Sequence, residues 1–237
     1  MKHENALLRA AVGLMLGLLL VSSGHAQSEQ KPVVKVPESG VPQIMTLEGT
    51  FVRAAYNREG YAILGYHVAN LSIGEEWMLL DFGVTLREGV SDYTLTRDAV
   101  SLETPDAKTL PLPSVEEYRS ARLQALEQRA RVSRDSINYF PPSASHACRI
   151  GFFNELDAPV MPWDHVELSS SRACLGRLFF KVPGGIAYGQ HWLNVKFEKS
   201  LVRVPFRILT KDEEKLLSKN YKSISKQVKD AFKPKKQ

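Results

Sequence analysis

The chain has 237 residues, of which 43% are hydrophobic and 24% are charged, which is long enough to bury a hydrophobic core and fits one domain with additions or one large domain. Its formal net charge of +5 is unevenly placed, because residues 211–237 carry nine lysines against four acidic residues while 27–210 is close to neutral. The basic balance therefore gives no sign of a nucleic-acid groove on the body of the protein, and we expect no nucleic-acid partner.

Residues 1–26 have the three parts of a cleavable secretory signal peptide. A positively charged start is followed by an apolar run of twelve residues, 10–21, and Gly24 and Ala26 supply the small residues expected before a cleavage site. A membrane-spanning helix needs roughly 20 apolar residues, so this run is too short to be an anchor. We therefore predict export to the periplasm or the extracellular space, with no transmembrane segment left after cleavage.

Residues 27–43 are polar and punctuated by proline, which predicts a flexible leader, and we expect a β domain over 44–210. Its first strands are indicated by apolar residues that alternate with others over 61–69 and, more clearly, over 77–86. A period of two places every second side chain on one face of a sheet. The segment 77–86 therefore predicts a strand with a fully apolar face.

Further short strands are predicted toward the end of the domain. Residues 91–112 contain two of them, joined by a turn at 104–108. Apolar and polar residues alternate over 191–198 and 202–209, and since only three residues separate these segments they should form a hairpin. Pro205 cannot donate a ladder hydrogen bond, so the second strand belongs at an edge or a bulge. The remaining predicted strands are 147–153 and 174–182.

The pattern changes to a helical period over 114–133, where Ser114 and Glu117 form a capping box. We predict one helix inserted into the β domain, solvated on its outer side and laid over the sheet. An arginine-lined anion site is the alternative, although acidic residues of the same helix can pair with the arginines. These arginines are Arg119, Arg122, Arg129 and Arg131.

A second capping box, Thr210 with Glu213, starts an amphipathic C-terminal helix over 211–232, and a basic tail, 233–237, follows it. The apolar residues of this helix recur at helical spacing and would dock on the domain. Its lysines could contact an anionic membrane surface or an unknown envelope protein, and an ordinary docked helix with a solvated end is the alternative. The interaction tail predicted in this way contains Lys226, Lys229, Lys233, Lys235 and Lys236.

Cys148 and Cys174 are the two cysteines of the chain. In an exported protein such a pair predicts a disulfide. The alternative is a zinc site completed by His146 and His165, whose ligand types suit the metal but whose spacing fits no familiar zinc finger. We predict the disulfide, and we expect neither a metal nor another cofactor.

Candidate catalytic residues are few. Asp164 and His165 are adjacent, but adjacent side chains on a chain tend to point apart, and the sequence lacks the Gly-x-Ser-x-Gly elbow that presents a nucleophile. A catalytic role would require a pocket with converging polar side chains and perturbed pKa values. A binding role would instead require an exposed apolar patch, which we expect in 154–168 or near the helices.

The order of these patterns resembles the telokin-like, immunoglobulin-like domain of bacterial exported proteins of unknown function. The likeness rests on WMLLDFGVTLREG (77–89), DYTLTRDAVSLETPDAKTLPLP (92–113), GRLFFKVPGGIAYGQHWLNVKF (176–197) and VRVPFRIL (202–209). It covers roughly 45–100 and 174–209, and the chain departs from it over 113–146 and in the C-terminal helix. The resemblance implies a mainly β fold, an immunoglobulin-like β-sandwich, here with one inserted helix and one C-terminal helix. It implies no catalytic residues.

These observations predict an exported, non-catalytic binding or scaffolding module of the cell envelope. Its ligand stays open, because a fold of this class hosts many unrelated functions. The alternative from another class is an envelope hydrolase or a metal-dependent enzyme.

Overall fold

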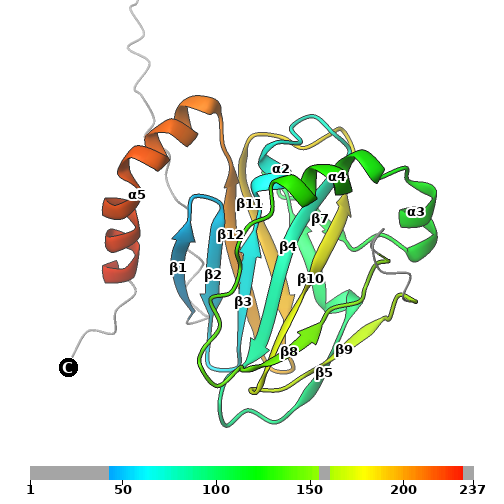
Figure 1. The fold of residues 1–237 in the computed structure, drawn as a ribbon, viewed down its shortest axis with the longest axis vertical. Coiled ribbons are helices and arrows are strands. Elements are labelled where there is room, and N and C mark those ends of the chain that lie inside the picture. The colour runs from blue at the N-terminus through cyan, green and yellow to red at the C-terminus, as the bar shows by residue number, and fades with distance from the viewer. Residues whose placement is uncertain (1–42, 155–160, 232–237) are drawn as a thin grey trace, which may run out of the picture. The chain divides into compact units, whose positions relative to one another are not determined.

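The computed structural model describes residues 43–154 and 161–231, and within them the protein is mainly β, with three sheets and a few helices (Figure 1). The six-stranded sheet contains, in spatial order, β1 (Ile44–Gly49), β2 (Val52–Tyr56), β3 (Gly60–Gly65), β4 (Trp77–Leu86), β10 (Arg172–Lys181) and β8 (His146–Arg149). The four-stranded sheet contains β12 (Leu201–Ile208), β11 (Gly189–Lys196), β6 (Val100–Glu103) and β7 (Thr109–Pro111). A third sheet consists of β5 (Tyr93–Thr96) and β9 (His165–Leu168).

The six-stranded and four-stranded sheets share one hydrophobic core. A period of two in β4, β11 and β12 directs alternate apolar side chains into this core, where burial contributes about 25 cal/mol for each Å² of apolar surface. These side chains, each at most 1% exposed, are Met78, Leu80, Phe82 and Val84 from β4, Leu193 and Val195 from β11, and Val202, Val204 and Phe206 from β12.

The predicted hairpin is confirmed: β11 and β12 pair antiparallel, and Pro205 lies opposite Trp192. β12 is the outermost strand of its sheet, which agrees with the edge position predicted from the missing N–H of Pro205. The strand predicted over 77–86 is β4. The strand predicted over 61–69 ends earlier, at Gly65, because the chain turns into a short helix, α2 (His67–Asn70).

The predicted C-terminal helix is α5 (Lys211–Ala231), and it lies beside β1 at the edge of the six-stranded sheet (Figure 1). Its capping box is formed, since the Thr210 N–H donates to Glu213 Oε2 at 2.9 Å and the Glu213 N–H to Thr210 Oγ1 at 3.3 Å. The hydroxyls of Tyr221 and Ser225 donate to the carbonyl oxygen of Leu47 at 2.9 and 3.1 Å. The helix thus satisfies part of the open backbone of an edge strand.

The prediction of one inserted helix over 114–133 is wrong, because two helices are found, α3 (Val115–Ser120) and α4 (Gln124–Val132). Tyr118 and Leu123 are both buried. On a continuous helix they would lie about 140° apart, so one helix could not direct both into the core. The backbone therefore becomes extended at Ala121 (φ −79°, ψ 119°). No helix in the described part of the chain has the length and hydropathy of a membrane span.

Candidate functional site

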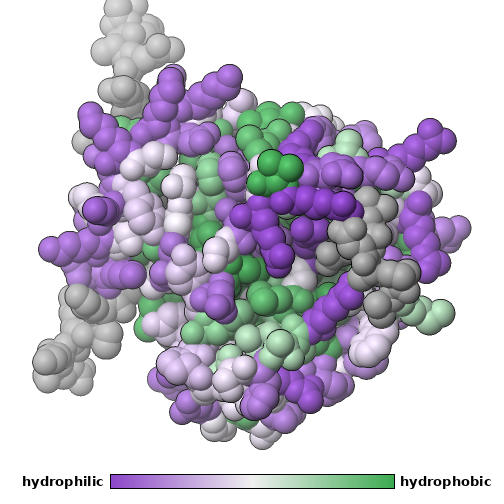
Figure 2. All heavy atoms as spheres, viewed as in Figure 1, coloured by the Kyte–Doolittle hydropathy of each residue, from purple (hydrophilic) through white to green (hydrophobic). Residues whose placement is uncertain are grey.

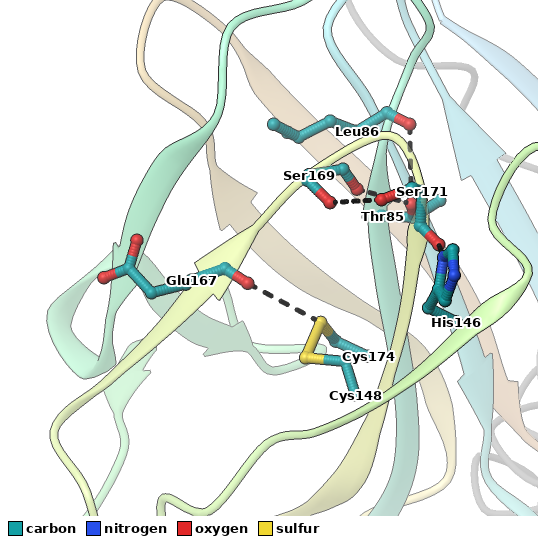
Figure 3. Close-up of a disulfide and its surroundings, with 8 residues drawn as sticks. All are labelled: Thr85, Leu86, His146, Cys148, Glu167, Ser169, Ser171 and Cys174. Carbon is teal, nitrogen blue, oxygen red and sulfur yellow. Dashed lines mark hydrogen bonds between the residues drawn. A yellow bond between two sulfur atoms is a disulfide. The ribbon is translucent and has the colours of Figure 1, made fainter.

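Cys148 and Cys174 form a disulfide, as predicted. β8 runs parallel to β10 and places the two cysteines directly opposite each other, with their Cα atoms 4.0 Å apart (Figure 3). The register pairs His146 with Arg172 and Ala147 with Ala173. The bridge therefore links two strands of one sheet, and it uses both thiols that a zinc site would need.

The turn between β9 and β10 precedes the strand that carries Cys174. Cys174 is fully buried, and the Ser169 carbonyl oxygen accepts a hydrogen bond from Thr85 Oγ1 at 3.2 Å (Figure 3). His146 directs Nδ1 to the Ser171 carbonyl oxygen at 3.3 Å, so it faces the turn. A buried disulfide of this kind indicates an oxidising, non-reducing compartment.

The other residues singled out by the sequence are dispersed. The Asp164 carboxylate lies 3.8 Å from Arg97 Nε, while His165 is exposed at the start of β9. Arg97 itself donates to the carbonyl oxygens of Phe152 and Pro113, which fixes its guanidinium between two segments. Asp164 thus belongs to the surroundings of a structural arginine.

The four arginines of the inserted segment do not lie on one helix face. Arg119 belongs to α3 and Arg122 to the link after it, and both are exposed. In α4, Arg129 donates to Ser72 Oγ at 2.5 Å and pairs with Glu75 at 2.9 Å. Arg131 is exposed on α4. The four arginines are thus divided between α3, the link and α4, and they do not form the single helix face predicted for an anion site.

Within the segment predicted to carry an apolar patch, Met161 and Trp163 are exposed, at 79% and 59%. Residues 155–160 lie outside the described part of the chain. Of the predicted interaction tail, Lys226 and Lys229 are exposed on α5, and Lys233, Lys235 and Lys236 lie outside the described residues. The signal segment 1–26 and most of the leader 27–43 also lie outside them.

A cleft of about 840 Å³ opens where three connections meet at one end of the two sheets, and we call it the three-loop cleft. The connections are the β2–β3 turn, the β4–β5 loop and the β11–β12 turn. Its volume is in the range of small-molecule sites, about 300–1,000 Å³. Its lining includes apolar atoms of Val90, Phe197 and Leu201 and three exposed cations, Arg58, Lys196 and Lys199.

A buried carboxylate holds the loops of this cleft together. Glu59 accepts the Lys199 N–H at 3.1 and 3.2 Å and the Ser200 hydroxyl at 2.5 Å. Asn57 Oδ1 accepts the N–H groups of Glu59 and Gly60, and Asn57 Nδ2 donates to Ser200 Oγ at 2.8 Å. The β2–β3 turn is thereby tied to the β11–β12 turn by buried hydrogen bonds.

A buried histidine lies near the other end of β11. His191 is fully buried and stacks on Phe206, with ring centroids 5.3 Å apart. Its Nδ1 lies 3.1 Å from the Gly189 carbonyl oxygen, which can only accept, so Nδ1 carries the proton. Burial lowers the pKa of His191 to about 4, and the ring is therefore neutral at physiological pH.

An acid pair, the buried Asp81 and the half-buried Asp135, lies on the opposite face of β4 from the main core. Asp81 is 4% exposed, with Oδ1 3.5 Å from Arg177 Nε, and its Oδ2 accepts the Asp135 N–H at 3.4 Å. Asp135 Oδ2 accepts the His67 N–H at 2.8 Å. Burial raises the pKa of Asp135 to about 6 and also raises that of Asp81, against the lowering effect of Arg177.

Neither the three-loop cleft nor the acid pair could be found from the sequence, because each joins residues more than 50 positions apart. Comparison with family models, with curated proteins and with solved structures found no match to this chain. The functional argument therefore rests on the geometry of the site alone.

Replacing both cysteines by alanine should lower the free energy of unfolding by about 3.5 kcal/mol, the loop-closure contribution for a separation of 26 residues. Urea unfolding of wild type and of C148A/C174A measures this difference. Reductant should destabilise the wild type by a similar amount and leave the variant unchanged. A variant as stable as the oxidised wild type would show that the bridge constrains nothing.

Asp135→Asn should stabilise the protein at pH 7 by about 1–2 kcal/mol, after allowance for partial solvent screening. The folded-state pKa of about 6 exceeds the ordinary value of 3.8, so the wild type loses stability as pH rises from about 4 to about 6. Asparagine keeps an acceptor for the His67 N–H. Unfolding curves of both proteins should converge below pH 4, and equal stability at pH 7 would contradict the raised pKa.

His191→Phe keeps a ring against Phe206 and removes a titrating group. Because the folded-state pKa of about 4 is below the ordinary 6.5, the wild type should lose up to about 3 kcal/mol as pH falls from 6.5 to 4. The variant should show a flatter profile over this interval. Thermal unfolding at closely spaced pH values separates the two, and parallel profiles would refute a buried neutral histidine.

Proposed function

We propose that this chain is an exported, non-catalytic binding module of the cell envelope that holds its ligand in the three-loop cleft. Two features support export: the signal-like pattern of residues 1–26 and a disulfide, which is typical of a non-reducing compartment. The observation that carries the binding role is a cleft at the ends of two packed sheets whose turns are tied together by hydrogen bonds. Sites on loops held by a rigid scaffold are the usual place for recognition.

The hydrogen bonds inside the cleft favour binding over catalysis. A general acid or base needs a titratable group free to exchange a proton with a substrate. Both carboxylate oxygens of Glu59 instead accept hydrogen bonds from the β11–β12 turn, and Asn57 donates to the same turn. Glu59 and Asn57 therefore hold the turns in place, and the ligand would be recognised by the walls and rim of the cleft.

The chemistry of the walls and rim indicates a ligand with an apolar body and an anionic end. The half-buried Val90 and Leu201 supply apolar surface, while Phe197, also in the lining, is a buried core residue. The exposed rim groups are three cations, Arg58, Lys196 and Lys199, against one exposed carboxylate, Glu198, since Glu59 is buried. Such a rim attracts an anion while the walls take up the apolar part.

We also propose that the two sheets form an immunoglobulin-like sandwich. Two sheets share one core, and three connections gather at one of its ends. Binding loops at one end of a two-sheet sandwich are a known arrangement for recognition. In this chain the disulfide differs from the usual one of that fold, because it joins neighbouring strands of a single sheet.

Ser91→Trp tests the cleft with an apolar anionic dye, anilinonaphthalenesulfonate, as the probe. Ser91 is exposed at the rim, so a large side chain there should fill the cleft without entering the core. We expect dye binding, followed by fluorescence titration, to weaken at least tenfold. Ala187→Trp, at an exposed position lining a smaller cleft of about 300 Å³, is the matched control and should bind like the wild type.

The charge variant R58Q/K196Q/K199Q completes this test. It should reduce dye affinity while circular dichroism and thermal unfolding stay those of the wild type, because all three side chains are exposed. Equal dye binding by the wild type and S91W would place the dye elsewhere and end the cleft proposal. Loss of binding in A187W alone would do the same.

A further inference from the structure

Six lysines form a row along α5, and we call it the lysine row. Their spacings of four and three residues put them within an arc of about 80° around the helix, at 100° per residue. From first to last the row spans about 27 Å, at 1.5 Å per residue. All six are exposed, and they are Lys211, Lys215, Lys219, Lys222, Lys226 and Lys229.

The apolar side of α5 is already occupied. Leu217 packs against the main core, and Tyr221 and Ser225 donate to the Leu47 carbonyl oxygen of β1. The half-buried stripe that contains Leu217 and Tyr221 lies about 140° from the centre of the lysine row. Figure 2 shows hydrophilic side chains gathered along the outer side of α5, on the left of the view.

Acidic groups near the row are fewer than its lysines, and Glu214 of α5 lies on the half-buried side of the helix. Asp212 and Asp230 flank its two ends, and Asp212 Oδ1 is 3.9 Å from Lys215 Nζ. Glu213 is bound by Arg207 at 2.8 and 3.0 Å, so it caps the helix and does not neutralise the row. Glu48 lines a groove beside Lys222 and Lys226 and is the one β1 carboxylate there. Glu48 is a single negative charge beside two lysines, so the middle of the row keeps a net positive charge.

We propose that the lysine row binds an anionic lipid surface, with α5 lying flat on the head groups while it stays docked on β1. A straight row about 27 Å long matches a flat, continuous layer of negative charge, which can meet all six ammonium groups at once. The apolar stripe is used inside the protein, so attachment is electrostatic and does not insert the helix. This role is separate from ligand binding in the three-loop cleft.

The test measures retention of the processed chain, as secreted by an expression host, on sedimented vesicles. The vesicles contain equal parts of phosphatidylglycerol and phosphatidylcholine, or phosphatidylcholine alone. Each lysine near an anionic surface contributes about fivefold in affinity, so K219Q/K222Q/K226Q should bind on the order of 100-fold more weakly than the wild type. Replacement of the same three by arginine should preserve binding, because it preserves charge.

The matched control is R58Q/K196Q/K199Q, which removes three exposed cations from the body and should keep vesicle retention. Conversely, the lysine variant should keep dye binding in the cleft, so failure of one proposal is distinguished from failure of the other. About 1 M salt, where the Debye length is about 3 Å, should release the wild type.

Three results would overturn the lipid proposal: no retention of the wild type on the anionic vesicles, equal loss in the body variant, or retention that resists salt. The first would leave an acidic protein as the partner of α5. The last would mean that the helix leaves β1 and inserts its apolar stripe.

Discussion

The pairing of β4 with β10 is the contact on which the rest of the structure depends. Eight residue pairs, from Cys174 opposite Val84 to Lys181 opposite Trp77, join the first four strands of the chain to a strand about 90 residues later. β4 is buried along almost its whole length, so its backbone groups must find partners within the sheet. β3 pairs with one side of β4 and β10 with the other, so β10 also sets where β8 and the disulfide can lie.

Local patterns predicted the elements whose signal is contained in their own sequence. The alternation in 77–86, 191–198 and 202–209 is enough to identify β4 and the β11–β12 hairpin, and Pro205 identifies the edge. The Thr210–Glu213 capping box starts α5 at the expected residue. The disulfide was predicted from the signal-like pattern of residues 1–26 and an even number of cysteines.

The remaining features depend on contacts distant in sequence. Nothing in residues 114–133 shows that Tyr118 of α3 and Leu123, the residue just before α4, must both face the core, and this requirement splits the predicted helix. The three-loop cleft is assembled by Glu59 reaching Lys199 and Ser200, about 140 positions away. A helical period places the six lysines on one side, but only the docking of α5 on β1 shows that this side faces solvent.

Because α5 covers β1, the order in which the chain is synthesised determines how long this edge strand stays exposed. Strands β1 to β4 are delivered first, yet β10 and α5 belong to the last third of the sequence. Until they are synthesised, both edge strands of the partial sheet, β1 and β4, have unpaired backbone groups that can pair with other chains. The last helix therefore covers an edge strand that stays exposed until synthesis is almost complete. A chain that is truncated before α5 should be the most prone to aggregation.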